Sequence, residues 1–278
     1  ARVLLMIRYG VSGMPPQDVQ DAEFLDELVA NGRTAYELAF VKEFAWNERR
    51  CEAFGAAAAE RDVWLSVHAP YFAILTVEDE DKSKQCLAAL EHTMKLGRAL
   101  GSRIICAHFG PIGDREPVEL MEVIRRRLES IAPKVAHLGV GLGLETAGND
   151  RTFGSIGDIA TLADEFPFVR PIIDWAHVHA VTGGGLTSKE AFATVIEFIR
   201  DSFPAWMIEP LQTQFTDNLV GDHGEVKHVP YGEGTLRVEP LVEAAVEAGL
   251  RMVMISESRD ADSHAAIQQS QAPLQFAS

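Results

Sequence analysis

RIICAHFGPIGDREPVELMEVIRRRLESIAPKVAHLGVGLGLE, residues 103–145, is the stretch that decides the fold. It begins with a short apolar run, Arg103–His108, continues through an amphipathic segment, Val118–Ala136, and ends in a second apolar run, Gly139–Glu145. Short runs rich in β-branched residues, separated by a segment of helical periodicity, are typical of parallel strands joined by a crossover helix. The stretch therefore predicts one strand–helix–strand unit of a parallel sheet.

The same pattern recurs along the whole chain and predicts eight strands. These are Val3–Arg8, Ala35–Phe40, Val63–His68, Arg103–His108, Gly139–Glu145, Val169–Asp174, Met207–Phe215 and Met252–Glu257. Eight units without a glycine-rich phosphate motif after the first strand favour an α/β fold of the closed (β/α)8 TIM-barrel type. A doubly wound open sheet is the alternative. We expect residues 1–278 to form a single domain, with a polar tail or final helix from about residue 260.

Composition and charge limit the compartment and the partners. No apolar run is long enough to cross a bilayer and no signal-peptide pattern is present, so we expect a cytoplasmic protein without a membrane partner. The three cysteines form no C-x-x-C pair, which predicts free thiols. A formal net charge of −16 repels nucleic acid at long range, although local charge at a site outweighs the total. The sequence does not specify an oligomeric state.

Most of the potential metal ligands fall at the ends of predicted strands, where a TIM barrel places its active site. They are His68, His108, Glu145, Asp174 and Glu257, with His177 one helical turn after Asp174 and His228 in the long loop after strand seven. Carboxylates that converge on one rim repel one another unless cations lie between them. Mixed imidazole and carboxylate ligands suit Zn²⁺, Mn²⁺ or Fe²⁺ better than Ca²⁺. The pattern therefore predicts two or three divalent metal ions at this rim.

Five short segments carry a resemblance to a known family. SVHAPY (66–71), AHFGP (107–111), LETAG (144–148), IIDWAH (172–177) and HVPYGEG (228–234) together resemble the endonuclease IV family of AP endonucleases, within the xylose isomerase-like barrel superfamily. In that family three Zn²⁺ ions hold a hydroxide that attacks the phosphodiester 5′ to an abasic site. The resemblance implies a metal-dependent phosphodiesterase or endonuclease that hydrolyses DNA at abasic or damaged sites through a metal-bound hydroxide, in DNA repair.

The resemblance also implies roles for the residues that match. His68 and His108 would hold one ion, and Glu145 would bridge it to a second. Asp174 and Glu257 would complete that second site, while the third ion would lie on His177 and His228. Glu145 and Glu257 are then the expected catalytic residues. For substrate binding, Tyr71 and Phe72 match the bulky pair that enters DNA at the lesion, and Lys42 lies where the family has a basic residue.

The sequence departs from the family at two ligand positions. Gln214 stands where the family has a histidine at the end of strand seven, and Val226 replaces the aspartate that precedes the last histidine by two residues. An amide oxygen is a poorer ligand for Zn²⁺ than imidazole, so the second ion is expected to bind less tightly. Glu225, Asp222 or His223 would have to supply the missing carboxylate or imidazole. A site with two ions, or with Mn²⁺ or Fe²⁺, is the alternative.

Two other functions compete with the nuclease. A sugar isomerase or epimerase of the same superfamily would use one divalent metal on Glu145, Asp174, Gln214 and Glu257 to act on a small sugar. The net charge of −16 favours it, whereas the paired histidines His68 and His108 favour the nuclease. A non-catalytic binding protein on a degenerate barrel is the third possibility.

Overall fold

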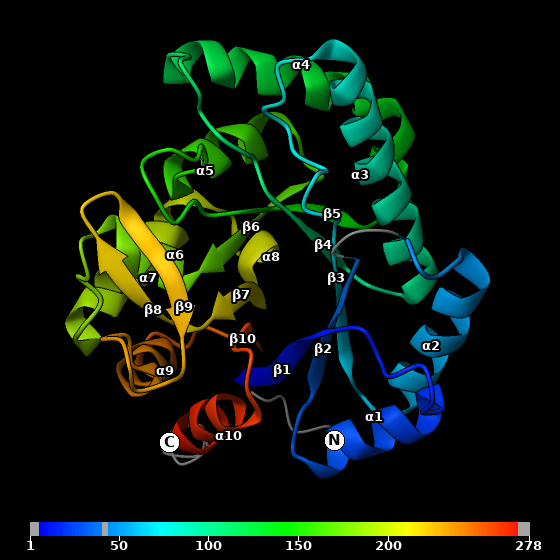
Figure 1. Cartoon of the computed structure of the whole chain (residues 1–278), viewed down its shortest axis with the longest axis vertical. Helices are drawn as coiled ribbons and strands as arrows, with labels where there is room; N and C mark the ends of the chain where they lie inside the picture. The colour runs from blue at the N-terminus through cyan, green and yellow to red at the C-terminus, as the bar shows by residue number, and fades with distance from the viewer. Residues whose placement is uncertain (1–5, 41–43, 272–278) are drawn as a thin grey trace.

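Eight parallel strands close into a barrel in this computed structural model, which describes residues 6–40 and 44–271 (Figure 1). The barrel strands are β1 (Ile7–Gly13), β2 (Ala35–Ala39), β3 (Trp64–His68), β4 (Ile104–Ala107), β5 (Gly141–Glu145), β6 (Val169–Asp174), β7 (Leu211–Phe215) and β10 (Met252–Ser256). Each strand pairs with the next along the chain, and β10 pairs with β1 to close the circle. The predicted closed (β/α)8 architecture is confirmed.

Helices connect the strands and surround the barrel (Figure 1). They are α1 (Asp21–Ala30), α2 (Glu48–Glu60), α3 (Glu80–Leu100), α4 (Pro117–Val135), the 3₁₀ turn η1 (Ala136–Leu138), α5 (Ile156–Glu165), α6 (Trp175–Val181), α7 (Lys189–Ser202), α8 (Ala205–Ile208), α9 (Val238–Glu247) and α10 (Ala261–Gln271). Within the described part of the chain, no helix has both the length and the apolar character to span a membrane. In the segment from about residue 260, where a polar tail or final helix was expected, the described residues form the helix α10.

Two of the predicted strands differ from the observed ones. For the first prediction, Val3–Arg8, residues 3–5 lie outside the described part, and β1 runs on to Gly13. The predicted range Met207–Phe215 begins too early, because Met207 belongs to α8 and β7 starts only at Leu211. Pro210, directly before β7, has no N–H to donate to a neighbouring strand, which limits how far the strand extends.

A β-hairpin that was not predicted stands between β7 and α9. It consists of β8 (Asp217–Gly221) and β9 (Gly224–Val229), which pair antiparallel outside the barrel. His228 therefore lies on a strand, and its expected position in a loop was wrong. Asn218 donates from Nδ2 to the Ala176 carbonyl at 2.9 Å, and this bond ties the hairpin to α6. The hairpin thus has a fixed place beside the barrel mouth (Figure 1).

The buried Asp217 side chain fixes the loop that follows the hairpin. Its carboxylate accepts backbone hydrogen bonds from Gly232, Gly234 and Leu236 at 2.9 to 3.1 Å. It also forms an ion pair of 3.0 Å with Arg237 Nη1. Hydrogen bonds to an ionised, buried acceptor are stronger than neutral ones, so this carboxylate holds the base of the hairpin firmly.

Gly97 lets α3 lie directly against the barrel. A Cβ atom at this position would come within 2.8 Å of Ile105 Cγ2 and 3.4 Å of Val140 Cγ1. Both neighbours are buried, and neither branched side chain moves easily in a close-packed interior. The missing side chain is therefore what sets the distance between α3 and β4.

We expect Gly97→Ala to destabilise the protein by about 1 to 3 kcal/mol, because the new methyl group overpacks this contact. This cost exceeds the gain of about 1 kcal/mol that alanine brings to a helix interior. The matched control is Gly157→Ala in the exposed first turn of α5, where the nearest atom would lie at an ordinary 3.7 Å. In urea unfolding, Gly97→Ala should lower the free energy of unfolding and Gly157→Ala should raise it. Changes in the same direction would contradict the packing argument.

Candidate metal centre at the mouth of the barrel

The carboxyl ends of the barrel strands bring the predicted site residues together. His68, Glu145 and Asp174 are the last residues of β3, β5 and β6, and Glu257 directly follows β10. His108 comes just after β4 in the same way. Because parallel strands of a closed barrel all end at the same face, these side chains meet at its mouth although they are far apart in the sequence.

Glu145 lies at the centre of this group. Its Oε2 is 3.9 Å from His68 Nε2 and 3.6 Å from His108 Nδ1, and its Oε1 is 3.1 Å from His177 Nδ1. Burial alone would raise the pKa of Glu145, but the three histidines outweigh it and hold the pKa well below its usual range. Glu145 is therefore an ionised carboxylate with two oxygens facing different neighbours.

Backbone carbonyls orient two of the histidine rings. His68 Nδ1 donates to the Ala69 carbonyl at 2.7 Å, and His177 Nδ1 donates to the Thr146 carbonyl at 2.7 Å. A carbonyl can only accept, so in the neutral form of each ring the proton lies on Nδ1 and the lone pair on Nε2. In the metal-free protein the neighbouring carboxylates raise the pKa of His177 well above its usual range, so a metal ion would have to displace the proton on its Nε2. Metal-binding histidines are usually held in this way, with one nitrogen bonded to an acceptor and the other free for the ion.

Asp174, Gln214 and Glu257 form the second part of the centre. Gln214 Nε2 donates to Glu257 Oε1 at 3.0 Å. Among the described residues, the buried atoms Asp174 Oδ2 and Gln214 Oε1 have no hydrogen-bond donor. Burial raises the pKa of Glu257 well above its usual range, and the charges of Glu145 and Asp174 add to the effect. Unpaired oxygens and crowded carboxylates together indicate a missing positive charge, which a divalent cation fits.

The third part combines α6 with the hairpin. His228 Nε2 lies 3.2 Å from Glu225 Oε1, and His177 Nε2 lies 3.9 Å from the same oxygen. Asn218 Nδ2 donates to Glu225 Oε2 at 2.8 Å and so holds this carboxylate in place. Of the three substitutes expected for the missing family aspartate, Glu225 is the one beside His228. His223 instead pairs with Asp150 at 2.8 Å, on the exposed surface.

Among the described residues, three groups of possible ligand atoms result, each with its atoms within 4.8 Å of one another. They are His68–Cys106–Glu145, Glu145–Asp174–His177 and His177–Glu225–His228. Neighbouring groups share Glu145 or His177, so the three form one continuous row. The mixture of imidazole and carboxylate donors, with the Cys106 thiol in the first group, fits transition-metal ions such as Zn²⁺ or Mn²⁺.

Sequence reasoning missed two residues at the floor of the centre. Glu37 on β2 is fully buried and accepts a hydrogen bond of 2.9 Å from Ser66 Oγ. Burial raises its pKa. Cys106 Sγ donates to Glu145 Oε2 at 3.1 Å, and burial and that charge raise the thiol pKa well above its usual range. An acidic residue inside the apolar run AYELA was the signal that could have identified Glu37.

Of the three expected substrate-binding residues, Tyr71 contacts histidines of the centre, and Phe72 follows it in the loop after β3. Tyr71 and Phe72 are 57% and 49% exposed, so about half of each residue remains open to solvent. The Tyr71 ring centroid lies 5.3 Å from that of His68 and 5.8 Å from that of His108, which places it over the entrance. Lys42 lies outside the described residues.

A comparison with protein families agrees with this architecture. The model of the xylose isomerase-like TIM barrel family matches residues 25–276. The chain belongs to the xylose isomerase-like TIM barrel family. One relative, an uncharacterised protein of Methanocaldococcus jannaschii, is 23% identical over 91% of this chain and 92% of its own length. A probable endonuclease 4 of Streptomyces avermitilis is 24% identical over 70% of this chain and 65% of its own length.

Solved structures of two enzyme classes in this xylose isomerase-like fold resemble the chain about equally. Endonuclease IV from Thermus thermophilus superposes with a TM-score of 0.73 at 18% identity, over 96% of this chain and 98% of that one. A D-tagatose 3-epimerase-like protein gives 0.72 at 14% identity, over 96% of both chains. At such identities the likeness establishes the fold, so the choice between nuclease and epimerase depends on side chains.

We expect Glu257→Gln to stabilise the metal-free protein near pH 8. When folding raises the pKa of a carboxyl, the folded protein loses stability as the pH rises above the carboxyl's unfolded pKa of about 4.3. Glutamine has no proton to lose, so the variant avoids this loss. The advantage of the variant should shrink as the pH falls toward about 4. Urea unfolding in EDTA measures it, with the exposed Glu129→Gln on α4 as control. A variant that is less stable than wild type at pH 8 in EDTA would contradict this account.

Proposed function

We propose that this chain is a divalent-metal-dependent phosphodiesterase that cleaves DNA at abasic or otherwise damaged sites. The observation that carries the proposal is the row of three adjoining ligand groups, with Glu145 shared by two of them. Bound divalent ions would supply an activated water and positive charge for the phosphate oxygens. A phosphodiester needs both, because negative charge builds up on the leaving oxygen as the bond breaks.

The third ligand group favours a nuclease over an isomerase. A single-metal isomerase needs only the donors of Glu145, Asp174, Gln214 and Glu257. It leaves no role for the pairing of His228 with Glu225, which the hairpin places at 3.2 Å. His68, at the other end of the row, and His108, whose Nδ1 lies 3.6 Å from Glu145 Oε2, would also lack a function. Bringing these histidines and carboxylates together removes water from polar groups, which costs free energy. A site that holds several ions gives each of these groups a partner.

The chain's own residues would position the substrate. Glu145 orients the histidines on both of its sides, and Gln214 holds Glu257 through its amide hydrogens. Tyr71 offers a flat, exposed ring beside the centre, where an unpaired base could stack, and the exposed Phe72 is next to it in the chain. Lys42, after β2, would contact a phosphate. Local contacts of this kind can overcome the net charge of −16, since salt screens distant charges and the ions neutralise the pocket.

One observation favours the second candidate, a sugar epimerase. The pKa of Glu145 is lowered, whereas that of Glu257 is raised well above its usual range, so the two carboxyls differ in protonation. A pair of acids driven apart in this way suits proton transfer at a sugar carbon, with one group as base and the other as acid. A small sugar, in place of damaged DNA, would then be the substrate.

The purified protein should carry at least about two divalent ions per chain, because clusters of this kind bind metal tightly. Elemental analysis after gel filtration would measure the content of Zn, Mn and Fe. The exposed substitution Glu129→Gln should leave the content unchanged, whereas His228→Ala should reduce it by about one ion. A wild-type content below about one ion per chain would contradict the proposal.

We expect the metal-loaded protein to incise an oligonucleotide that contains an abasic-site analogue. Glu145→Gln should reduce the rate by about two orders of magnitude or more, because it removes the shared charge at the centre of the row. Glu129→Gln again serves as the matched control. A metal-loaded wild type that leaves the DNA intact, yet interconverts ketoses, would favour the epimerase instead.

Gln214→His should increase the affinity for Zn²⁺ by about tenfold, since an imidazole nitrogen binds Zn²⁺ better than a neutral amide oxygen. Titration of the metal-free proteins against a competing chelator would measure this difference. Gln85→His on the exposed face of α3 is the control for an added surface histidine. Equal affinities in Gln214→His and wild type would place Gln214 outside the set of ligands.

A further inference from the structure

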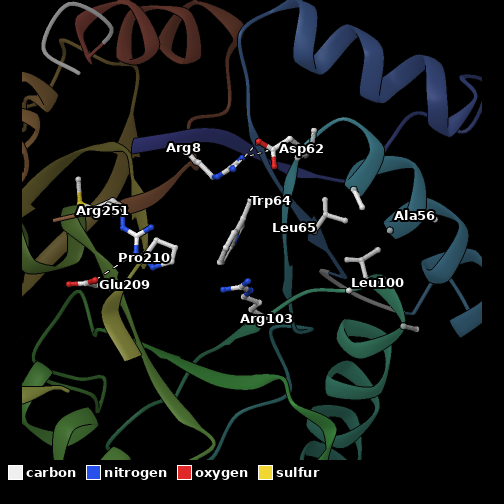
Figure 2. A pocket seen from close by; sticks show the side chains of 16 residues that line it. Arg8, Ala56, Asp62, Trp64, Leu65, Leu100, Arg103, Glu209, Pro210 and Arg251 are labelled. Carbon is white, nitrogen blue, oxygen red and sulfur yellow. Dashed lines mark hydrogen bonds and ion pairs between the residues drawn. The ribbon is translucent and has the colours of Figure 1, made fainter. Parts of the chain in front are cut away.

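A hollow lies where the barrel strands begin, at the end of the barrel opposite to the candidate metal centre. Figure 2 shows the side chains that line it. Its volume is about 730 Å³, within the range of small-molecule sites. It is lined by residues at the beginnings of strands: Arg8 in β1, Trp64 at the start of β3, and Arg103 and Arg251 directly before β4 and β10. None of these residues takes part in the centre at the barrel mouth.

Guanidinium groups dominate the polar lining of this hollow. Arg8 forms an ion pair of 3.1 Å with Asp62, and Arg251 forms one of 3.6 Å with Glu209. Within the described ranges, no carboxylate lies at ion-pair distance from Arg103, whose guanidinium carbon is 5.4 Å from the centre of the Trp64 ring. The lining therefore has an excess of positive charge in a chain whose net charge is −16.

A smaller hollow next to it adds a fourth arginine. It shares Trp64 and Arg103 with the larger hollow, and its lining includes Arg170 and Trp206. The Arg170 guanidinium carbon lies 4.2 Å from the centre of the Trp206 ring. Positive charge thus continues along this end of the barrel, which attracts anions electrostatically.

Trp64 provides a fixed flat surface inside the hollow. Its Nε1 donates to Gln212 Oε1 at 3.1 Å, and this bond sets the orientation of the ring. Leu65, Leu100 and Ala56 form an apolar wall on one side, while Arg251 and Pro210 face it from the other (Figure 2). A ligand that suits both sides combines an anionic group with a planar, largely apolar one.

We propose that this hollow binds a phosphate-bearing small molecule with a planar group, the chemical class of a mononucleotide. Phosphate has three outer oxygens and accepts hydrogen bonds from several guanidiniums that approach from different strands. Arg103 and Arg251 would hold the phosphate, and the planar group would lie against Trp64. The site does not depend on the proposed hydrolysis, because it is at the other end of the barrel and requires no metal ion.

Calorimetric titration of the purified protein with AMP, inorganic phosphate and adenosine tests the proposal. AMP should bind most tightly, because only AMP carries both a charged phosphate and a planar base. Arg103→Ala should weaken AMP binding by at least about tenfold, because it removes a charge-assisted hydrogen bond. Arg200→Ala, an exposed arginine on α7, should leave binding unchanged. AMP should also alter tryptophan fluorescence in wild type, and Trp64→Phe should remove that change.

Two results would overturn the proposal. One is the absence of AMP binding to a wild type that is folded by circular dichroism. The other is AMP binding of equal strength in wild type and Arg103→Ala, which would place the ligand elsewhere on the molecule. If adenosine binds as tightly as AMP, the guanidiniums do not recognise phosphate and the assigned ligand class is wrong.

Discussion

Negative charge enclosed at one end of an apolar barrel is the constraint around which this structure is organised. Glu37, Glu145 and Asp174 are all buried, and each loses hydration that water would otherwise provide. Histidines around Glu145 compensate for part of this loss, so that this carboxyl remains ionised while Glu257 holds its proton more tightly. The oxygens that still lack donors belong to Asp174 and Gln214, in the same few ångströms of space. Cations are the natural complement to that arrangement.

Hydrogen-bonded polar side chains continue through the barrel interior to its other end. Glu37 accepts from Ser66 Oγ, which accepts from Gln212 Nε2 at 3.2 Å, and Gln212 in turn accepts from Trp64 Nε1. A chain of hydrogen bonds therefore runs along the axis from the floor of the candidate metal centre to the arginine-lined hollow. Every member has a partner, which is how a polar chain persists inside a close-packed core. The two ends have opposite local charge: carboxylates and histidines at the mouth, guanidiniums at the base.

The hairpin adds ligands to the candidate metal centre at the barrel mouth. A barrel alone would give the centre the ligands from its strand ends, enough for one or two ions. Asp217 and Asn218 anchor β8 and β9 to the following loop and to α6, and this brings Glu225 and His228 to His177. The third ligand group thus depends on a hairpin outside the barrel, whose own position is set by buried polar contacts. Segments after the strands of a TIM barrel are typically where its chemistry is varied.

The sequence alone determined the eight-stranded plan and the strand-end positions of His68, Glu145, Asp174 and Glu257, because apolar periodicity and the residue that ends each run are local properties. Only the tertiary structure decided that Glu37 points inward, since strand register around the closed barrel fixes which alternate side chains face the axis. It also placed Glu225 beside His177. That contact joins a hairpin to a helix far away in the sequence, and no local pattern encodes the packing that brings them together.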